Sequence, residues 1–178
     1  GTNPGFLYQQ NTMRDAMVAA ITLNVFMNHC DRVCMANLAQ TVNVLQSVIL
    51  TEGDKMVKTP TYHVFDLYKA HQDAQQVDCF VESEEVGEGQ FTLPQVIASA
   101  SQKDGKLTLT LANTSMDKAT EVEIAGVCLC KAQGRILKGE ATQYNDFDNS
   151  PLAVEAFDGI EGNKVKLPAC CVVELTIG

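Results

Sequence analysis

The chain has 178 residues, 46% of them hydrophobic, and a net charge of −9. This length suits one domain or slightly more, and the hydrophobic share excludes a disordered chain. The negative charge argues against a nucleic-acid partner, because binding to phosphates needs Lys and Arg, and no apolar run approaches the roughly 20 residues that cross a membrane.

A helix is predicted over residues 12–27, where apolar side chains recur at helical spacing. Asn11 or Thr12 is a suitable N-cap, and Asp15 falls in the first turn, where the helix dipole favours a carboxylate. His29 follows the helix. We interpret it as a residue at a helix C-terminus rather than as a catalytic group or metal ligand.

The next segment, residues 33–38, is a short apolar run typical of a buried strand, although periodicity alone does not exclude a helix. Uncharged hydrogen-bonding side chains stand at its end and beyond it: Asn37, Gln40, Asn43 and Gln46. Amides offer both donors and acceptors and so match the hydroxyls of a sugar. They serve equally well to satisfy the backbone of a loop, so both interpretations stay open at this point.

Residues 41–58 are expected to form a loop with a turn at residues 52–55. A second helix is predicted from Pro60 to about residue 72, with Thr59 as N-cap and proline at the first helical position. His63 and His71 lie eight residues apart on this helix. Because that spacing puts them two turns apart, we predict no metal site there.

From residue 73 onward the sequence alternates between apolar and polar residues in short runs separated by turn signals. About eight strands at such intervals are typical of a β-sandwich or jelly roll. The predicted strands cover residues 77–81, 95–101, 106–113, 121–124, 127–131, 135–137, 165–167 and 171–177.

Three motifs in this β-rich part suggest ligands or modification. The acidic run at residues 82–88 is interpreted as a solvated loop rather than a calcium site. Residues 146–150 begin like a calcium loop, but Pro151 stands where the EF-hand requires glycine. Asn113 opens an N-glycosylation pattern. We therefore expect neither a metal nor a cofactor.

Seven cysteines are present, without a Cys-x-x-Cys pair. An odd number at irregular spacing suggests neither a zinc ribbon nor a disulfide framework, so we predict reduced residues in the core. No signal peptide is visible, and a piece that lacks its protein's true N-terminus cannot show one. The compartment stays open between the cytoplasm and the periplasm or exterior of a bacterium.

Taken together, residues 8–16, 28–46 and 59–65 closely resemble glycoside hydrolase family 51, the α-L-arabinofuranosidases, in the part that follows the nucleophile. The motifs are Tyr-Gln-Gln-Asn-Thr-Met-Arg-Asp-Ala, Asn-His-Cys-Asp-Arg-Val, Met-Ala-Asn-Leu-Ala-Gln, Val-Asn-Val-Leu-Gln and Thr-Pro-Thr-Tyr-His-Val-Phe. They occur in the family's order and spacing from about residue 6 to 71. The remainder fits the family's C-terminal β-domain in size and pattern.

The resemblance implies a mainly β chain with an α/β N-terminal part. Residues 1–72 would be the last helix–strand–helix elements of a (β/α)8 barrel, with residues 33–38 as its eighth strand, and residues 73–178 a jelly-roll-like β-sandwich. A complete barrel needs roughly 250 residues and is excluded. In this fold, active sites lie at the C-terminal ends of the strands, which is where Asn37 and Gln40 fall.

The family hydrolyses terminal α-L-arabinofuranosides with retention, using two glutamates. The nucleophile lies in a Glu-Trp-Asn-like segment, and this chain has no Trp, so neither glutamate is assigned and the chain alone is expected to be inactive. Matched residue by residue, Gln40 corresponds to a residue that hydrogen-bonds arabinose. Asn37, Asn43 and Gln46 are weaker candidates for substrate binding.

The expected partners are arabinofuranosyl-containing glycans. Apolar surfaces that face the rest of the barrel are expected to pack on the sandwich or to join copies of the chain into a homo-oligomer. The alternative is a non-catalytic structural or carbohydrate-binding β-sandwich. Residues 73–178 hold few aromatic side chains on which a sugar could stack, which favours a structural role over a lectin-like one.

Overall fold

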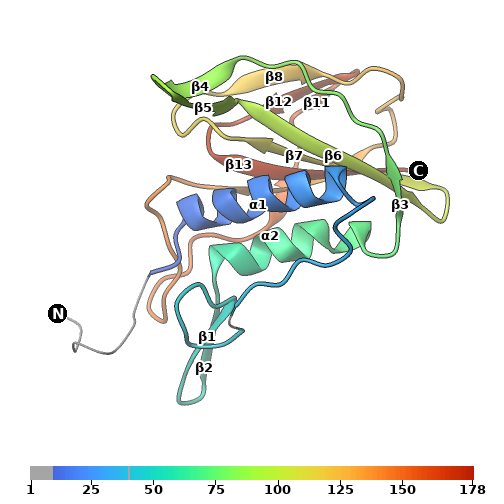
Figure 1. Ribbon diagram of the computed structural model, residues 1–178. Coiled ribbons are helices and arrows are strands. Elements are labelled where there is room, and N and C mark those ends of the chain that lie inside the picture. The colour runs from blue at the N-terminus through green and yellow to red at the C-terminus, as the bar shows by residue number, and fades with distance from the viewer. Residues whose placement is uncertain (1–9, 40) are drawn as a thin grey trace.

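Two helices, a six-stranded sheet and a smaller three-stranded sheet lie in three successive layers (Figure 1). The structure is a computed structural model, and it describes residues 10–39 and 41–178. The helices are α1 (Met13–Asn28) and α2 (Pro60–Tyr68), and a short 3-10 turn, η1 (Lys69–His71), follows α2. Both helices pack on one face of the large sheet.

The six-stranded sheet is antiparallel throughout, in the order β10-β9-β13-β7-β6-β3. Its longest strands, β6, β7 and β13, lie next to one another. The strands are β3 (Gln75–Val77), β6 (Val96–Lys103), β7 (Lys106–Asn113), β9 (Gln133–Lys138), β10 (Glu155–Phe157) and β13 (Cys171–Ile177).

The small sheet has the order β11-β12-β8, with β11 (Ile160–Glu161), β12 (Lys164–Leu167) and β8 (Thr120–Glu123). Two hairpins stand apart from both sheets. The hairpin of β4 (Glu85–Glu88) and β5 (Phe91–Pro94) lies beside the small sheet, whereas the hairpin of β1 (Ile49–Glu52) and β2 (Lys55–Lys58) projects below the helices (Figure 1).

The side chains of β13 point alternately into two hydrophobic cores. Cys171, Val173 and Leu175 belong to the core between the two sheets, and Val172 belongs to the core under the helices. Because successive strand residues point to opposite faces, one strand serves both cores. The helices contribute to the second core the buried residues Met13, Ala16, Met17, Ala20, Val64, Leu67 and Tyr68.

A buried polar cluster also joins the helices to the sheet. Asn24 of α1 is fully buried and donates a hydrogen bond to the hydroxyl of Tyr68, at 2.7 Å. Its carbonyl oxygen accepts from Ser99 and Thr110 of the sheet. Burial raises the pKa of Tyr68. These bonds satisfy polar groups that would otherwise be costly inside a core, so they fix the position of α1 on the sheet.

Both predicted helices are present, and Thr12 and Thr59 are their N-caps. Strands are confirmed within six of the eight predicted ranges: 95–101, 106–113, 121–124, 135–137, 165–167 and 171–177. The range 135–137 falls inside the longer β9. The chain is mainly β, as predicted.

Five predictions of local structure are wrong. Residues 33–38 are extended but form no strand, because a strand needs neighbours to bond and none of the described residues supplies one. Of residues 77–81 only Val77 is in a strand, and residues 127–131 form a turn and irregular chain. The expected loop at 41–58 instead contains the hairpin β1–β2, and the expected loop at 82–88 contains β4, the first strand of the exposed hairpin β4–β5.

The glycosylation pattern at Asn113 marks a structural residue. Its side chain is fully buried and donates to the carbonyl oxygens of Lys118 and Pro168, at 2.9 and 2.8 Å. A glycan has no room there. The calcium-like segment also has a structural explanation, since a carboxylate oxygen of Asp146 accepts from the backbone N–H groups of Asp148 and Asn149 and so closes a turn.

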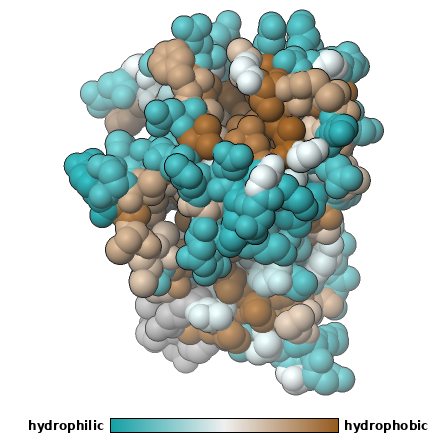
Figure 2. Space-filling view, turned by 90° about the vertical axis from the view of Figure 1, so that its right-hand side faces the viewer, coloured by the Kyte–Doolittle hydropathy of each residue, from teal (hydrophilic) through white to brown (hydrophobic). Residues whose placement is uncertain are grey.

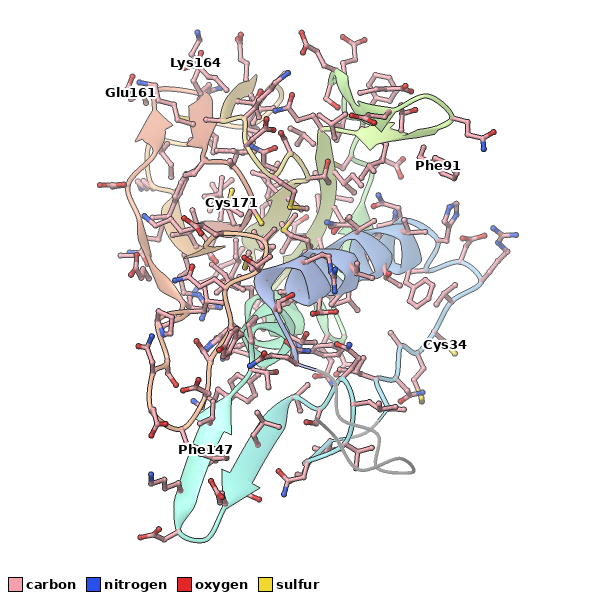
Figure 3. The ribbon with its side chains drawn as sticks, turned by 90° about the vertical axis from the view of Figure 1, so that its left-hand side faces the viewer. Cys34, Phe91, Phe147, Glu161, Lys164 and Cys171 are labelled. Carbon is pink, nitrogen blue, oxygen red and sulfur yellow. The ribbon has the colours of Figure 1, made fainter. Side chains whose placement is uncertain are left out.

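The placement of the cysteines differs from the prediction. Cys170 and Cys171 are buried, and burial raises their pKa values to about 11 and about 12. Cys79 is half-buried, and four others are exposed: Cys30, Cys34, Cys128 and Cys130. Figure 3 shows Cys34 pointing away from the body and Cys171 in the interior. A position within an apolar run of the sequence therefore did not imply that the cysteine is buried.

Candidate functional site

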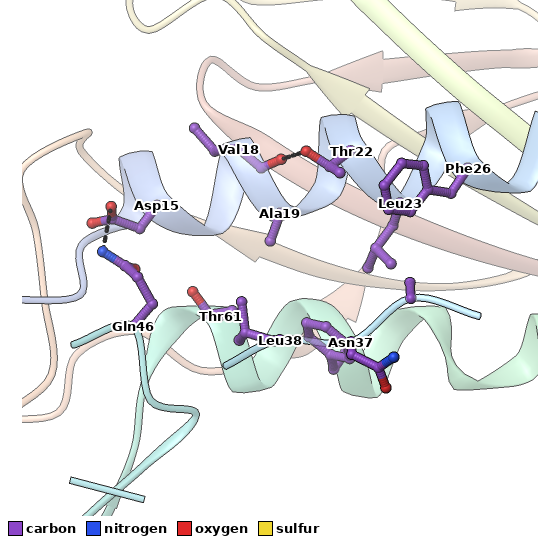
Figure 4. A pocket seen from close by; sticks show the side chains of 12 residues that line it. Asp15, Val18, Ala19, Thr22, Leu23, Phe26, Asn37, Leu38, Gln46 and Thr61 are labelled. Carbon is purple, nitrogen blue, oxygen red and sulfur yellow. Dashed lines mark hydrogen bonds between the residues drawn. The ribbon is translucent and has the colours of Figure 1, made fainter. Parts of the chain in front are cut away.

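A cavity of about 330 Å³ lies between α1, the extended segment 36–38 and the start of α2 (Figure 4). It is the place where the predicted binding segment meets the helices. Most of its wall is apolar. The lining includes Val18, Leu23, Phe26, Asn37, Leu38 and Gln46.

The start of α1 is fixed by a capping box. One carboxylate oxygen of Asp15 accepts from the backbone N–H and the hydroxyl of Thr12, at 2.7 and 2.8 Å. Its other oxygen accepts from the side-chain amide of Gln46, at 3.3 Å (Figure 4). The carboxylate is therefore held by the helix terminus, where such a group is favourable.

Buried Asn11 ties three segments together beside this cavity. Its side-chain N–H2 donates to Gln46 at 2.9 Å and to the hydroxyl of Thr61 at 2.8 Å, and its carbonyl oxygen accepts from the backbone N–H of Thr61. The beginning of α1, the loop at Gln46 and the beginning of α2 thus share one hydrogen-bond network. This network positions the wall of the cavity.

The four predicted substrate-binding residues have different surroundings. Gln40 lies outside the described residues. Asn37 is exposed and lines the cavity, and Gln46 lines it too, although both ends of its amide are bonded to Asn11 and Asp15. Asn43 is not among the lining residues, and its side chain bonds Thr51 at 2.7 and 2.9 Å, which holds the start of the β1–β2 hairpin. The cavity therefore brings together Asn37 and Gln46.

The chemistry available at this cavity is limited to binding. Asp15 is the one carboxylate among the described residues that line it, and the capping box already engages it. Retaining glycoside hydrolysis needs two carboxyl groups roughly 5 Å apart. The described residues around this cavity can hold a ligand through amides and apolar contact, but they supply no acid–base pair.

A second cavity, of about 450 Å³, lies on another side of α2, against β9 and β10. Asp66 lines it, bonded to Arg135 at 2.9 Å and to Lys69 at 2.6 Å. Burial raises the pKa of Asp66, but the hydrogen bonds from Lys69 and Arg135 outweigh this effect and the pKa lies below its usual value. Burial, with the charge of Lys58, lowers the pKa of His63 in the same cavity.

Sequence reasoning did not find the Asp66–Arg135 pair. The two residues lie 69 positions apart, and no spacing rule connects a helix to a strand at that distance. Their contact depends on how α2 sits across the sheet.

Comparisons with known proteins agree with the predicted resemblance. The model of the α-L-arabinofuranosidase C-terminal domain family matches residues 1–170. An intracellular exo-α-L-arabinofuranosidase of Bacteroides ovatus is 45% identical over 188 aligned positions, which cover 99% of this chain and 36% of that protein.

Solved structures give the same assignment. The family 51 arabinofuranosidase of Xanthomonas axonopodis pv. citri matches with a TM-score of 0.90 and 42% identity, over 100% of this chain and 38% of that one. The thermostable family 51 enzyme of Thermotoga petrophila matches with a TM-score of 0.80 and 25% identity, over 97% of this chain and 40% of its own.

The chain thus spans little more than a third of the relatives that it matches. The family model covers almost its whole length. The predicted resemblance to family 51 is confirmed, and the chain belongs to the α-L-arabinofuranosidase C-terminal domain family.

Proposed function

We propose that this chain is the C-terminal region of a retaining α-L-arabinofuranosidase, which removes terminal α-L-arabinofuranosyl residues from arabinose-containing polysaccharides or oligosaccharides. The observation that carries the proposal is the match to the Xanthomonas enzyme, with 42% identity over the whole of this chain. Identity at that level along an entire domain supports a shared role for the domain.

Within the parent enzyme, α1, residues 33–38 and α2 would be the last elements of a (β/α)8 barrel, and residues 73–178 a jelly-roll-like sandwich. The division at residues 72 and 73 follows the change from helical to strand patterning. The extended residues 33–38 support this proposal, since they have the composition of a buried strand and yet no strand partner among the described residues. In the barrel they would pair with strands from upstream.

In that enzyme, Gln40 would hold sugar hydroxyls, with Asn37 nearby and Gln46 and Asn43 in support. Asn37 is exposed and lines the cavity. Gln46 and Asn43 instead hold the loop through the bonds described above. We therefore rank Gln40 and Asn37 ahead of them as substrate-binding residues.

The two glutamates would come from upstream of this chain. One would protonate the leaving oxygen, and the other would form a glycosyl-enzyme intermediate that water hydrolyses. The chain alone would supply binding contacts and a domain that packs against the barrel and supports it. It would therefore show no turnover.

The compartment and assembly of the parent are also proposed. The Bacteroides relative is named as intracellular, which supports a bacterial cytoplasmic location and, with it, reduced cysteines. Neither helix in the described part of the chain is long and apolar enough to cross a membrane. Exposed apolar side chains on α1 and the following segment, such as Val18, Val25 and Met35, would be covered by the upstream barrel or by a second copy.

The alternative is a non-catalytic carbohydrate-binding module. It would need aromatic side chains on a shared exposed surface. Phe80 and Phe91 are strongly exposed within residues 73–178 and Tyr144 is 37% exposed, but the three lie on separate segments. This surface fits a structural domain that supports the barrel better than it fits a carbohydrate-binding module.

The test is to follow the anomeric configuration of the arabinose that the full-length parent releases from an arabinan oligosaccharide, by proton NMR in the first minutes. Retention is expected. Inversion would remove the proposed mechanism, and no release from any arabinofuranosyl oligosaccharide would leave the structural or carbohydrate-binding alternative. The same module titrated alone with the oligosaccharide is the control for simple binding.

A further inference from the structure

Two cysteines stand close together in the connection between β8 and β9, residues 124–132. Cys128 and Cys130 are exposed free thiols, whereas Leu129 between them is buried in the core between the two sheets. Burial alternates from residue to residue here as it does in extended chain, so both thiols lie on the same side of the backbone. The sheets that this connection joins form the upper part of the molecule, where hydrophobic surface lies beside hydrophilic surface on one face (Figure 2).

The backbone that carries the two cysteines is fixed in place. The N–H of Leu129 donates to the side-chain carbonyl oxygen of Asn163, at 3.3 Å. The side-chain N–H2 of Asn163 in turn donates to the carbonyl oxygens of Ile124 and Val127, both at 3.0 Å. Because these bonds and the buried Leu129 hold the chain, the spacing of the two thiols is set by the fold.

The two sulfur atoms lie within reach of a mutual bond. Residues two positions apart have Cα atoms at most about 7 Å apart, and a disulfide joins Cα atoms about 4.4 to 6.8 Å apart. The backbone N–H of Cys130 already donates to the sulfur of Cys128, at 3.3 Å. A disulfide between them therefore needs only a small adjustment of the chain.

The same contacts make the two thiols unequal. Hydrogen bonds from the thiol and from the backbone N–H of Cys130 lower the pKa of the Cys128 thiol. The thiol hydrogen bond to Cys128 raises the pKa of Cys130. This asymmetry is typical of a redox-active pair, in which one exposed thiol of lowered pKa attacks and a neighbouring thiol resolves the mixed disulfide.

A second pair of neighbouring cysteines has the opposite surroundings. Cys170 and Cys171 are both buried, and burial raises their pKa values to about 11 and about 12. Because the thiolate is the form that attacks a disulfide, these two thiols are expected to be unreactive. They provide a matched internal control for the exposed pair.

We propose that Cys128 and Cys130 form a redox site that exchanges with low-molecular-weight disulfides. The Cys128 thiolate attacks one sulfur of the small disulfide, forms a mixed disulfide and releases the other half as a thiolate, which takes up a proton. Cys130 then gives its proton to solvent, attacks the sulfur of Cys128 and releases the second small thiol. Two cysteine thiols are oxidised to one disulfide while the small disulfide is reduced to two thiols, so no further oxidant is needed.

This site goes beyond the proposed function and does not depend on it, since thiol–disulfide exchange uses neither the upstream glutamates nor the sugar-binding amides. Exposed disulfides have higher reduction potentials than buried structural ones, so this one is expected to open again when reduced thiols are in excess. The proposed cytoplasmic location would keep the pair reduced until small disulfides accumulate.

The experiment treats the folded full-length parent with excess oxidised glutathione, then denatures it and blocks the remaining thiols with a maleimide. Trypsin cleaves after Lys118 and Lys131, and the peptide of residues 119–131 holds Cys128 and Cys130 and no other cysteine. Mass spectrometry should find this peptide with an internal disulfide, carrying neither maleimide nor glutathione. The peptide of residues 167–178, with the buried pair, should carry two maleimides. Two maleimides or two glutathiones on peptide 119–131 would overturn the proposal.

Two variants of the parent test the order of attack. Cys130→Ser should accumulate glutathione on Cys128, because no second thiol is left to release it. Cys128→Ser should take up glutathione on Cys130 about threefold or more slowly, since that thiol lacks the hydrogen bonds that favour its thiolate. Both side chains are exposed, so neither change should disturb the fold. Equal rates in the two variants would remove Cys128 as the attacking thiol.

Reversal distinguishes a redox site from a fixed cross-link. Reduced glutathione in about tenfold excess over the oxidised form should return peptide 119–131 to the dithiol. A disulfide that survives this treatment would contradict a reversible site. Arabinofuranoside hydrolysis, measured on the same samples, tests the proposed function separately: exchange without hydrolysis keeps the redox site and removes the enzyme assignment, and hydrolysis without exchange does the reverse.

Discussion

Asp66 of α2 and Arg135 of β9 form an ion pair at 2.9 Å that joins the helical layer to the sheet. The same guanidinium bonds Glu174 of β13, whose side chain is only 6% exposed. One arginine thus neutralises two carboxylates from different elements. The pair shows how the helices are held on the sheet by more than apolar contact.

Replacing Arg135 by Ala should therefore destabilise the chain by about 3 kcal/mol, because a buried carboxylate left without its partner is strongly unfavourable. The measurement is urea unfolding at pH 7. Lys138→Ala, on the same strand, is the control, since its pair with Glu155 is 3.8 Å long and exposed, and such pairs contribute about 0–1 kcal/mol. Equal losses in the two variants would show that Arg135 does not hold the layers together.

Apolar packing between α2 and the sheet should stabilise the fold at least as much as this ion pair does. Leu67 is fully buried there, so Leu67→Ala should lower the free energy of unfolding by about 2–5 kcal/mol through lost burial and a residual cavity. The measurement is again chemical unfolding. A decrease in the free energy of unfolding below about 1 kcal/mol would mean that α2 packs loosely on the sheet.

Val18 distinguishes the isolated chain from the parent. Its exposed fraction is 59% and it lines the cavity beside α1. Val18→Ala should change the stability of the isolated chain by less than about 0.5 kcal/mol, but should lower that of the full-length parent measurably, if the upstream barrel covers this face. The same small change in both proteins would contradict a covered face.

Acid should destabilise the fold through His71. Burial lowers its pKa from 6.5 to about 4. Because the folded value lies below the unfolded one, the unfolded chain binds more protons between these two pH values. Stability is then fully present above pH 6.5 and falls as the pH drops toward 4.

The check compares urea midpoints at pH 7 and pH 4.5 for the natural chain and for His71→Gln. The ring bonds Ser101 and Thr110 at 2.7 and 3.1 Å, and a glutamine amide can partly replace those contacts. The natural chain should lose more stability on acidification than the variant. An equal loss in both would assign the acid sensitivity to other groups.

In the full-length parent, Gln40→Ala and Asn37→Ala should reduce kcat/KM on an arabinofuranoside, with Gln40→Ala costing about tenfold to a hundredfold for a lost sugar hydrogen bond. Asn43→Ala is the comparison, because its side chain bonds Thr51 in the hairpin. Asn43→Ala should affect stability more than turnover. A Gln40→Ala enzyme with unchanged kinetics would remove Gln40 from the site.

Local sequence patterns predicted those helices and strands whose formation depends mainly on their own residues. Thr12 and Thr59 marked the helix starts, and alternation marked β7 and β13. The wrong predictions concern features that depend on contacts with distant parts of the chain. Residues 33–38 have strand composition but no strand to bond among the described residues, and the pairing of Arg135 with Asp66 depends on how distant elements dock.

The candidate site divides in the same way. The amides were singled out by residue type and by the motifs around them, and their role in binding stays a prediction. Asn37 and Gln46 line one cavity. The structural role of Gln46 could not be predicted, because its side chain is hydrogen-bonded to Asn11, which lies 35 positions away in the sequence. A polar side chain near a site has to be weighed against the backbone and cap bonds that it already makes.

The central claim is that this chain is the inactive C-terminal part of an arabinofuranosidase. Its most direct test is the hydrolysis of p-nitrophenyl α-L-arabinofuranoside by the full-length parent and by this chain, side by side at equal concentration. Turnover by the parent and none by the chain is the predicted result. Turnover by the isolated chain, or none by a folded parent, would contradict it.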